Sequence, residues 1–301
     1  MARALITGGN GLVGNELCAL LLKKGFEVYN LSRSGSAPKG AIGFRWDYES
    51  GYVNPKALEN IDVVFHLAGA SVANKKWTSE QKKIIIDSRV KTAELLYESF
   101  KTIDYKPKKV LSASGTGFYG FDNGTQMFNE NDPLGNGFLA EVTQKWEDVI
   151  SKFLKIGITP TSLRIGMVLS KNGGALDKLA MPIKLGIGSP IGSGNQLISW
   201  IHIDDLVRTM LFILDNEISG VFNCVATETP SNKEFTKALA KQLNRGLIFP
   251  NVPGFLLEML LGQMAKEIIL GGNASSNQKL KEAGFVFKHE NLKGALADLL
   301  V

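Results

Sequence analysis

The sequence predicts an α/β fold in which a doubly wound parallel sheet carries a smaller, mostly helical C-terminal lobe. Short apolar runs alternate with helical stretches over residues 1–170, as in parallel βαβ units, and again over 200–225. Glycines and prolines break this alternation over residues 171–199, and residues 226–301 are mostly helical. We therefore expect the first two ranges to form a sheet domain and the last two to form a lobe that covers a substrate.

The composition is that of a globular protein, and it argues against nucleic acid or a membrane as a partner. Apolar residues make up 44% of the 301 residues, and 34 Lys and Arg against 29 Asp and Glu form no basic run. No apolar stretch reaches membrane-spanning length without charges. Cys18 and Cys224 lie in apolar surroundings without metal-ligand spacing. We therefore expect reduced thiols, no metal site, and a location in the cytoplasm or an organelle matrix.

The first strand, residues 3–7, runs into a glycine-rich turn and then a helix over residues 16–24. Three glycines in the turn have the spacing GxxGxxG. Between a strand and a helix, such glycines allow a tight turn, let backbone N–H groups approach a pyrophosphate, and let the helix pack closely on the strand. The helix N-terminus also favours bound phosphate. This segment predicts a Rossmann-type dinucleotide site, with contacts from Thr7, Gly8, Asn10, Gly11, Leu12, Val13 and Gly14.

The end of the second strand, residues 27–31, predicts which dinucleotide binds. Sites that prefer NAD usually place a carboxylate there to bind the ribose 2′-hydroxyl. This chain has Ser32, Arg33 and Ser34 instead, and an arginine flanked by hydroxyls suits a 2′-phosphate. We therefore expect NADP(H) rather than NAD as the cofactor.

The third and fourth strands extend this site along the same edge of the sheet. Residues 44–47 form the third strand, and we expect the carboxylate of its last residue, Asp47, to accept a hydrogen bond from the adenine amino group. We expect His66, in the fourth strand (residues 61–67), to be an interior histidine with satisfied hydrogen bonds rather than a catalytic base. Small residues at the end of this strand let a cofactor lie against the backbone; the segment is Leu67, Ala68, Gly69 and Ala70.

The remaining elements continue the alternation and then lead into the lobe. We expect Thr78 or Ser79 to cap the helix that follows the fourth strand, and Asp204 to cap the helix through residues 208–215. The other expected elements are helices over 79–101, 138–155 and 255–270, and strands over 109–113, 158–170 and 221–224.

Together these segments resemble the extended short-chain dehydrogenase/reductases, the epimerase-type superfamily, over essentially the whole chain. The matching segments are 7–14, 67–70, 112–114 with 118–120, 163–166 and 200–205. More narrowly, the chain is similar to the atypical branch called epimerase family proteins, which carry a small C-terminal domain of unknown function matched by 245–253 and 281–285. The resemblance implies a Rossmann fold and further cofactor contacts from Ser88, Ser112, Arg164, Ile165 and Gly166.

The resemblance also implies a tyrosine and a lysine four residues apart on a helix, with a serine or threonine on the loop after the preceding strand. In that superfamily the tyrosine exchanges a proton with the substrate oxygen, and the lysine lowers the pKa of the tyrosine and holds the nicotinamide ribose. Here the helix positions are Leu139 and Thr143, or Phe138 and Val142 in the neighbouring register, and the loop position is Gly115. The usual proton relay is therefore missing. The candidate proton donors are Tyr119, Ser114 and Thr116, and His202 and Glu141 are further candidates.

Two functions agree with these residues. One is an NADP(H)-dependent oxidoreductase or epimerase acting on a small carbonyl or hydroxy compound. The other is a sensor or regulatory protein that binds NADP(H) without turnover. Relatives that act on nucleotide sugars hold the diphosphate with an arginine at the position of Ile198, which argues against such a substrate. Arg89 would hold another anion or form an ion pair, and the sequence leaves open both the substrate and a homodimer.

Overall fold

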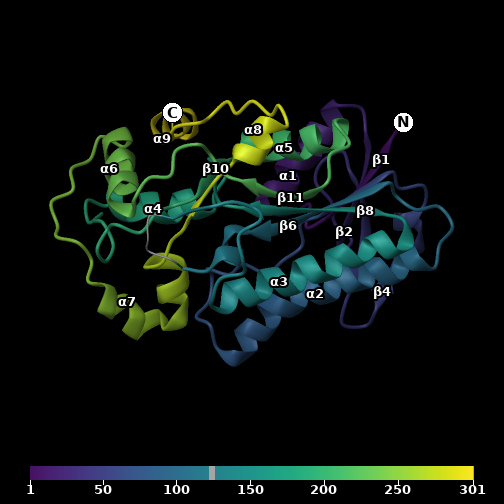
Figure 1. The fold of residues 1–301 in the computed structure, drawn as a ribbon, viewed down its shortest axis with the longest axis horizontal. Helices are drawn as coiled ribbons and strands as arrows, with labels where there is room; N and C mark the ends of the chain where they lie inside the picture. Colours follow the sequence, from purple (N-terminus) through teal and green to yellow (C-terminus); the bar gives the residue numbers. More distant parts are fainter. Residues whose placement is uncertain (122–125, 301) are drawn as a thin grey trace.

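The computed structural model describes residues 1–121 and 126–300, and its centre is an eight-stranded sheet (Figure 1). The strand order is β11-β8-β6-β5-β1-β2-β3-β4, and every neighbouring pair is parallel except β3 and β4. The strands are β1 (Arg3–Thr7), β2 (Glu27–Ser32), β3 (Ile42–Asp47), β4 (Tyr52–Val53), β5 (Val63–His66), β6 (Lys109–Gly115), β8 (Thr159–Ile165) and β11 (Gly220–Cys224). The chain winds outward in both directions from β1, so the predicted doubly wound sheet is confirmed.

Two pairs of helices enclose this sheet. Helices α1 (Leu12–Lys23) and α5 (Ile203–Asp215) cover one face, and α2 (Ser79–Lys101) and α3 (Phe138–Ser151) cover the other (Figure 1). Each pair buries an apolar stripe against the strands; Leu17 and Leu21 of α1 are fully buried on one face, as is Leu96 of α2 on the other. Because both faces are covered, the central strands are apolar almost throughout.

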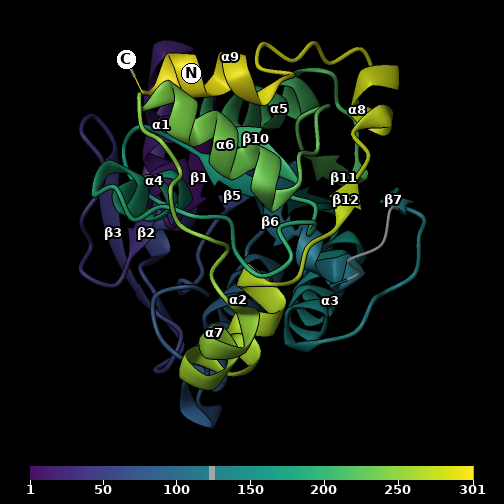
Figure 2. The same cartoon turned by 90° about the vertical axis from the view of Figure 1, so that its left-hand side faces the viewer.

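The lobe packs at the carboxyl ends of the strands (Figure 2). Its core joins α4 (Ala175–Lys184), α6 (Asn232–Gln242) and α9 (Leu292–Leu299) to a two-stranded sheet of β9 (Met167–Leu169) and β10 (Trp200–His202). Strands β7 (Met127–Phe128) and β12 (Ala274–Ser275) pair with each other. The segment after α8 (Gln278–Glu282) returns to the sheet domain, where Phe285 and Phe287 pack in the core beside α1 and α5.

Three predicted elements end differently in the structure. The strand expected over 158–170 divides at Gly166 into β8 and β9, because the chain changes partner there: the N–H of Gly166 donates to Cys224 at the end of β11, and that of Met167 donates to Ser199 before β10. The helix expected over 138–155 is α-helical only to Ser151 and continues as the 3₁₀ helix η3 (Lys152–Ile156). The helix expected over 255–270 ends at Gly262, whose φ of 61° is left-handed, leaving α7 (Gly254–Leu261) and the π turn η4 (Ala265–Ile269).

One cap also differs from its prediction. His202, rather than Asp204, caps α5: its Nδ1 accepts the backbone N–H of Asp204 at 3.1 Å. The cap of α2 is confirmed, because Thr78 Oγ1 accepts the N–H of Gln81 at 3.1 Å.

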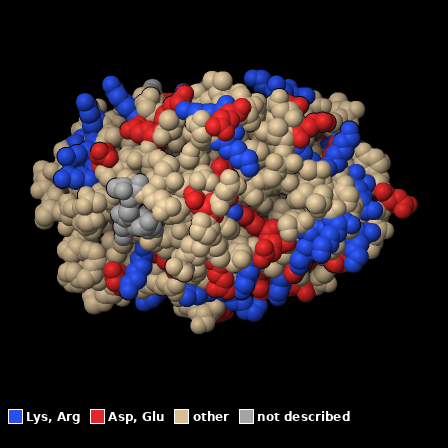
Figure 3. All heavy atoms as spheres, viewed as in Figure 1, with Lys and Arg blue, Asp and Glu red and all other residues tan. Residues whose placement is uncertain are grey.

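Charged side chains of both signs lie on the surface (Figure 3). Acidic and basic side chains are interspersed over the face drawn in Figure 3. Within the described residues, no helix combines the length and the apolar character needed to cross a bilayer. Cys18 and Cys224 are both buried, as expected.

Candidate functional site

The glycine turn between β1 and α1 has no room for side chains. Gly8 has a φ of 76°, and its carbonyl oxygen accepts the N–H of Gly11 at 3.0 Å. A Cβ on Gly14 would lie 2.3 Å from that same oxygen, and a Cβ on Gly8 would lie 2.9 Å from the backbone of Leu67. Glycine is therefore required at both positions for the turn to pack on β1, α1 and the end of β5.

Helix α1 begins at this turn as an open anion site. Gly11 is its N-cap, so no side chain caps the helix, and its first turn carries no acidic residue. The backbone N–H groups at the start of a helix lack intrahelical partners, and the helix dipole favours negative charge there. The predicted pyrophosphate cradle is thus built from backbone alone, which is the arrangement that a dinucleotide needs.

Asn30 ties this turn to the loop after β2, a role that the sequence analysis missed. Its side chain is completely buried, Oδ1 accepts the N–H of Gly9 at 3.0 Å, and Nδ2 donates to the carbonyl oxygen of Ser36 at 2.7 Å. Asn10 donates to the hydroxyl of Ser36 at 2.9 Å. The only signal in the sequence was a polar residue inside an otherwise apolar strand.

The loop after β2 presents the residues expected to select NADP(H). Ser32 donates to the Ser36 carbonyl at 2.7 Å, whereas Arg33 and Ser34 are exposed. Arg45 of β3, also exposed, pairs in register with Ser32, so a second arginine stands next to this loop on the neighbouring strand.

Asp47, at the end of β3, already has a hydrogen-bond partner. Its Oδ1 accepts the N–H of Glu49 at 3.0 Å, and this hydrogen bond lowers the pKa of the carboxyl. The predicted hydrogen bond from the adenine amino group would therefore go to the other carboxylate oxygen of Asp47.

His66, at the end of β5, is an interior residue, as expected. Thr7 Oγ1 accepts the N–H of Ala68 at 3.2 Å and forms a hydrogen bond with His66 Nδ1 at 2.8 Å. Burial of His66 lowers its pKa to about 4, which keeps the ring neutral. These hydrogen bonds fix the end of β5 relative to β1.

The segment after β5 is held by two neighbouring residues of α2. Ser88 Oγ accepts the N–H of Ala70 at 2.9 Å, and Arg89 Nη1 donates to the carbonyl oxygen of Ala70 at 3.0 Å. A Cβ on Gly69 would lie 3.0 Å from Arg89 Cζ. Gly69 therefore makes room for a guanidinium, whereas the sequence analysis assigned its small size to the cofactor alone.

Two of the three candidate donors belong to a buried polar cluster. Ser114 Oγ donates to Glu147 Oε1 at 2.6 Å, and Tyr119 donates to Asn223 Oδ1 at 2.7 Å. Arg164 forms a two-pronged ion pair with Glu147 at 3.0 and 2.9 Å and donates to the Tyr119 hydroxyl at 3.0 Å. Burial raises the pKa of Tyr119, although Arg164 opposes it.

Arg164 is thus turned into the protein, with its guanidinium 3.3 Å from the ring centroid of Phe118. The cofactor contact predicted for Arg164 would therefore come from its backbone. Ser112 is fully buried and bonds only to the carbonyl oxygen of Ala113, whereas Ile165 and Gly166 are half-buried at the carboxyl end of β8.

Thr116 differs from the other two candidates. It starts the 3₁₀ turn η2 (Thr116–Tyr119) after β6, is half-buried, and has no side-chain hydrogen bond to any residue that the structure describes. Its backbone carbonyl accepts Asn273 Nδ2 at 2.9 Å, which ties η2 to the lobe.

The comparisons with known proteins agree with this geometry. The model of the NAD dependent epimerase/dehydratase family matches residues 4–224. The chain belongs to this family. A model for a domain of unknown function matches residues 252–299, as expected for the atypical epimerase branch of the short-chain dehydrogenase/reductases. Family and fold together support a nicotinamide dinucleotide as the cofactor.

Named relatives cover the whole chain. An epimerase family protein of Staphylococcus aureus strain N315 is 36% identical over 100% of this chain and 99% of its own. The human epimerase family protein SDR39U1, solved with NADPH, is 28% identical with a TM-score of 0.86, covering 99% of this chain and 98% of the human one. A nucleoside-diphosphate sugar epimerase from Corynebacterium glutamicum is 30% identical with a TM-score of 0.79, covering 99% of this chain and 58% of that one.

This epimerase family member lacks the usual proton relay on α3. Leu139 and Thr143 stand at the two positions in one register and Phe138 and Val142 in the other, and Thr143 Oγ1 bonds back to the carbonyl oxygen of Leu139 at 2.9 Å within the helix. The side chain of Leu139 abuts Gly117, where a Cβ would lie 3.0 Å from that of the leucine. The start of α3 therefore packs closely against η2 through Leu139 and Gly117.

The lobe of this family member supplies the N-terminal cap of α3, which sequence reasoning missed. Gly137 precedes the helix and offers no side chain. Glu267, 6% exposed, accepts the N–H groups of Phe138 at 2.9 Å and Leu139 at 3.0 Å. A Cβ on Gly137 would lie 3.0 Å from this carboxylate. The helix that carries the relay in relatives is thus fixed to the lobe.

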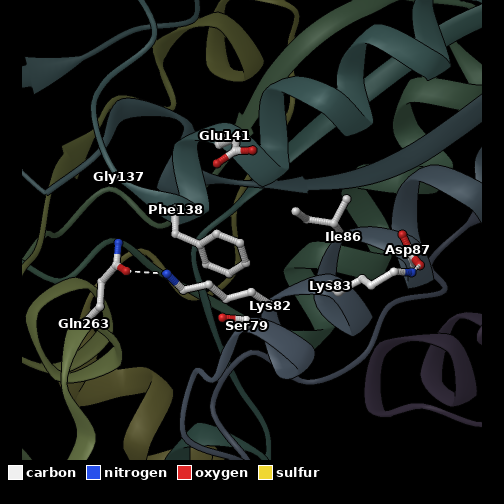
Figure 4. Close-up of a pocket in the computed structure, with 9 residues that line it drawn as sticks. All are labelled: Ser79, Lys82, Lys83, Ile86, Asp87, Gly137, Phe138, Glu141 and Gln263. Carbon is white, nitrogen blue, oxygen red and sulfur yellow. Dashed lines mark hydrogen bonds and ion pairs between the residues drawn. The ribbon is translucent and has the colours of Figure 1, made fainter.

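Glu141 and His202, the two outlying candidates, lie apart from each other. Glu141 is exposed, pairs with Lys145, and lines a groove of about 540 Å³ between α2 and α3, where Lys82 bonds to Gln263 (Figure 4). His202 lines a different pocket, beside α9, and its ring stacks on that of His289 at 3.7 Å. The structure does not bring these two side chains to one centre.

Proposed function

We propose that this protein is an NADP(H)-dependent oxidoreductase or epimerase that acts on a small carbonyl or hydroxy compound without a tyrosine–lysine pair. The observation that carries the proposal is the uncapped start of α1 behind a turn in which Gly8 and Gly14 have no room for a side chain, with a carboxylate-free, arginine-bearing loop beside it. Such a turn suits a pyrophosphate, and such a loop suits a 2′-phosphate. The human relative solved with NADPH supports the choice of NADP(H).

The preference for NADP(H) rests on charge at the end of β2. Arg33 is exposed there, Ser32 and Ser34 flank it, and Arg45 follows from the neighbouring strand. Guanidinium groups donate paired hydrogen bonds to phosphate oxygens, whereas a ribose 2′-hydroxyl gives them no charge to bind. These four residues are therefore our proposed 2′-phosphate site.

When bound, a nicotinamide supplies or accepts a hydride, and the chain has to bind and polarise the substrate oxygen. We assign that task to the hydroxyl of Thr116, since those of Ser114 and Tyr119 already donate to Glu147 and Asn223. Ser114 and Tyr119 then hold the end of β6 and η2 in place. A hydrogen bond from Thr116 stabilises developing charge on oxygen, and the alkoxide formed by hydride addition then takes its proton from water.

The cofactor assignment is tested by titrating the Arg33→Ala variant with NADPH and with NADH. NADPH affinity should fall by roughly 1.5–3 kcal/mol, the range for a hydrogen bond to a charged group, and NADH affinity should stay the same. Lys101→Ala, which removes an exposed cation at the far end of α2, is the control. Equal losses for both nucleotides would refute the 2′-phosphate site.

Turnover is tested by offering the protein NADPH with a panel of small aldehydes and ketones and following NADPH oxidation. Thr116→Val should slow any oxidation found and leave NADPH affinity unchanged, whereas Thr116→Ser should keep most of the rate. Tight NADPH binding with no oxidation across the panel would instead favour a sensor.

A further inference from the structure

Arg89 is an enclosed cation for which the described residues supply no counter-ion. Its guanidinium lies between the backbone of Gly69 and the indole of Trp146 on α3, with Cζ 5.2 Å from the ring centroid. Glycine at position 69 gives it room, because a Cβ there would lie 3.0 Å from Cζ, closer than ordinary van der Waals contact. The side chain is nevertheless partly open to solvent, so a ligand can reach it.

The hydrogen bonds of Arg89 use one of its three nitrogens. Nη1 donates to the carbonyl oxygens of Ala70 and Ile85, both at 3.0 Å. Within residues 1–121 and 126–300, Nε and Nη2 have no acceptor, and no carboxylate pairs with the guanidinium. Asp87, its nearest acidic neighbour in the chain, pairs with Lys83 and Lys91 instead. Burial lowers the pKa of Arg89 to about 10, which reflects the missing counter-charge.

The position of Arg89 indicates what would compensate this charge. Gly69 and Ala70 follow β5, which pairs with β1, and the strand order turns outward between these two strands. Ligands of open α/β sheets bind in the crevice at that point. Trp146 also stands one helical turn after Thr143, the residue at the lysine position of the family, so the guanidinium contacts the face of α3 on which that lysine would lie.

We propose that Arg89 binds the nicotinamide half of the cofactor, donating from Nε and Nη2 to its phosphate and ribose oxygens in place of the missing lysine. This inference rests on the proposed NADP(H) binding. In this arrangement the positive charge beside the nicotinamide ribose comes from α2 rather than from a lysine on α3. Arg33 then binds the 2′-phosphate, and Arg89 binds the part of the cofactor that NADP and NAD share.

The test compares Arg89→Gln with Lys91→Gln, which removes an equal charge from an exposed side chain of the same helix. Each variant and the wild type are titrated with NADPH, NADH and 2′,5′-ADP, a fragment without the nicotinamide half. Arg89→Gln should weaken NADPH and NADH alike by roughly ten- to a hundredfold, as expected for lost hydrogen bonds to a charged group. Its affinity for 2′,5′-ADP should equal that of the wild type, as should every affinity of Lys91→Gln.

The proposed NADP(H) binding and the proposed role of Arg89 would fail in different ways. If the wild type binds neither dinucleotide, the proposed function falls and this inference falls with it. If the wild type binds NADPH and Arg89→Gln binds it equally well, only this inference is overturned. Unchanged NADPH affinity with a raised KM for substrate would likewise overturn it and assign Arg89 to a substrate anion.

Thermal melting shows whether the Arg89→Gln variant is folded. The melting temperature of Arg89→Gln is first measured without ligand, because the substitution removes an uncompensated charge and also the two hydrogen bonds that Nη1 donates. Its melting temperature should then rise less on addition of NADPH. Arg89→Lys, which keeps the charge without the planar fork, should recover part of the NADPH affinity. An equal rise for Arg89→Gln and the wild type would contradict the proposal.

Discussion

Two arginines contact the sheet-facing side of α3, and they differ in how their charge is balanced. Arg164 meets both carboxylate oxygens of Glu147 and also bonds to Tyr119; although burial opposes it, this ion pair raises its pKa. Among the residues that the structure describes, Arg89 donates hydrogen bonds to carbonyl oxygens and to no carboxylate, and burial lowers its pKa to about 10. The protein itself supplies the carboxylate that balances the charge of Arg164. For Arg89, we propose that a ligand balances the charge.

Two neighbouring residues of α3 therefore contact arginines with different roles: one arginine stabilises the fold, and the other belongs to the proposed binding site. Glu147 and Trp146 are consecutive residues of α3, yet one neutralises an arginine and the other only stacks beside one. An arginine that brings its own carboxylate stabilises the fold, whereas an arginine without one is poised to bind an anion. The predictions below test each side of this contrast.

The largest effect is expected from breaking the Arg164 pair. Glu147→Ala leaves a buried guanidinium and the Ser114 hydroxyl without their acceptor, so the free energy of unfolding should fall by about 3–5 kcal/mol. Urea denaturation measures this. Glu141→Ala, which removes an exposed ion pair from the same helix, is the control and should change stability little. A loss no greater than that of the control would mean that Arg164 is not a framework residue.

A smaller effect is expected at the N-terminus of α3. Glu267→Ala leaves the N–H groups of Phe138 and Leu139 unpaired, so stability should fall by about 1–3 kcal/mol and these two amides should exchange hydrogen faster. Glu267→Gln keeps an acceptor and should lose less. Unchanged exchange at both amides in Glu267→Ala would show that the lobe does not hold this helix.

The smallest effect is a pH dependence that reports on Arg89. Burial, aided by the charge of Arg89, lowers the pKa of His66 from 6.5 to about 4. A lowered histidine pKa means that the unfolded chain binds a proton first, so stability is complete above pH 6.5 and is lost as pH falls toward 4. The loss between pH 6.5 and 5.5 should be about 1 kcal/mol.

This dependence should be absent in His66→Gln and weaker in Arg89→Gln, whose histidine no longer faces a positive charge. Melting temperatures measured from pH 7 to 5 give the comparison. An identical profile for the wild type and Arg89→Gln would mean that Arg89 does not act on His66.

What the sequence predicted well was local. The strand, glycine turn and helix around Gly8 to Gly14 depend on steric demands within a dozen residues, and the cap at Thr78 depends on one helical turn. The break at Gly166 and the cap by Glu267 depend on segments far away in the chain, Ser199 and the lobe. No local pattern encodes them.

The same reasoning applies to the site. The residue types at the end of β2 predict the cofactor because charge and size act locally, whereas the partners of a side chain depend on packing. Tyr119 and Ser114 were named as donors from their place in the chain, and only the structure shows their hydroxyls bonded to Asn223 and Glu147. Their catalytic role stays a prediction, as does that of Thr116.

The most direct test of this account is a calorimetric titration of the pure wild-type protein with NADPH and, separately, with NADH. The uncapped turn at Gly11 and the unpaired Arg89 predict that both nucleotides bind at one site, and Arg33 predicts that NADPH binds more tightly. Absence of binding by both nucleotides would contradict the account.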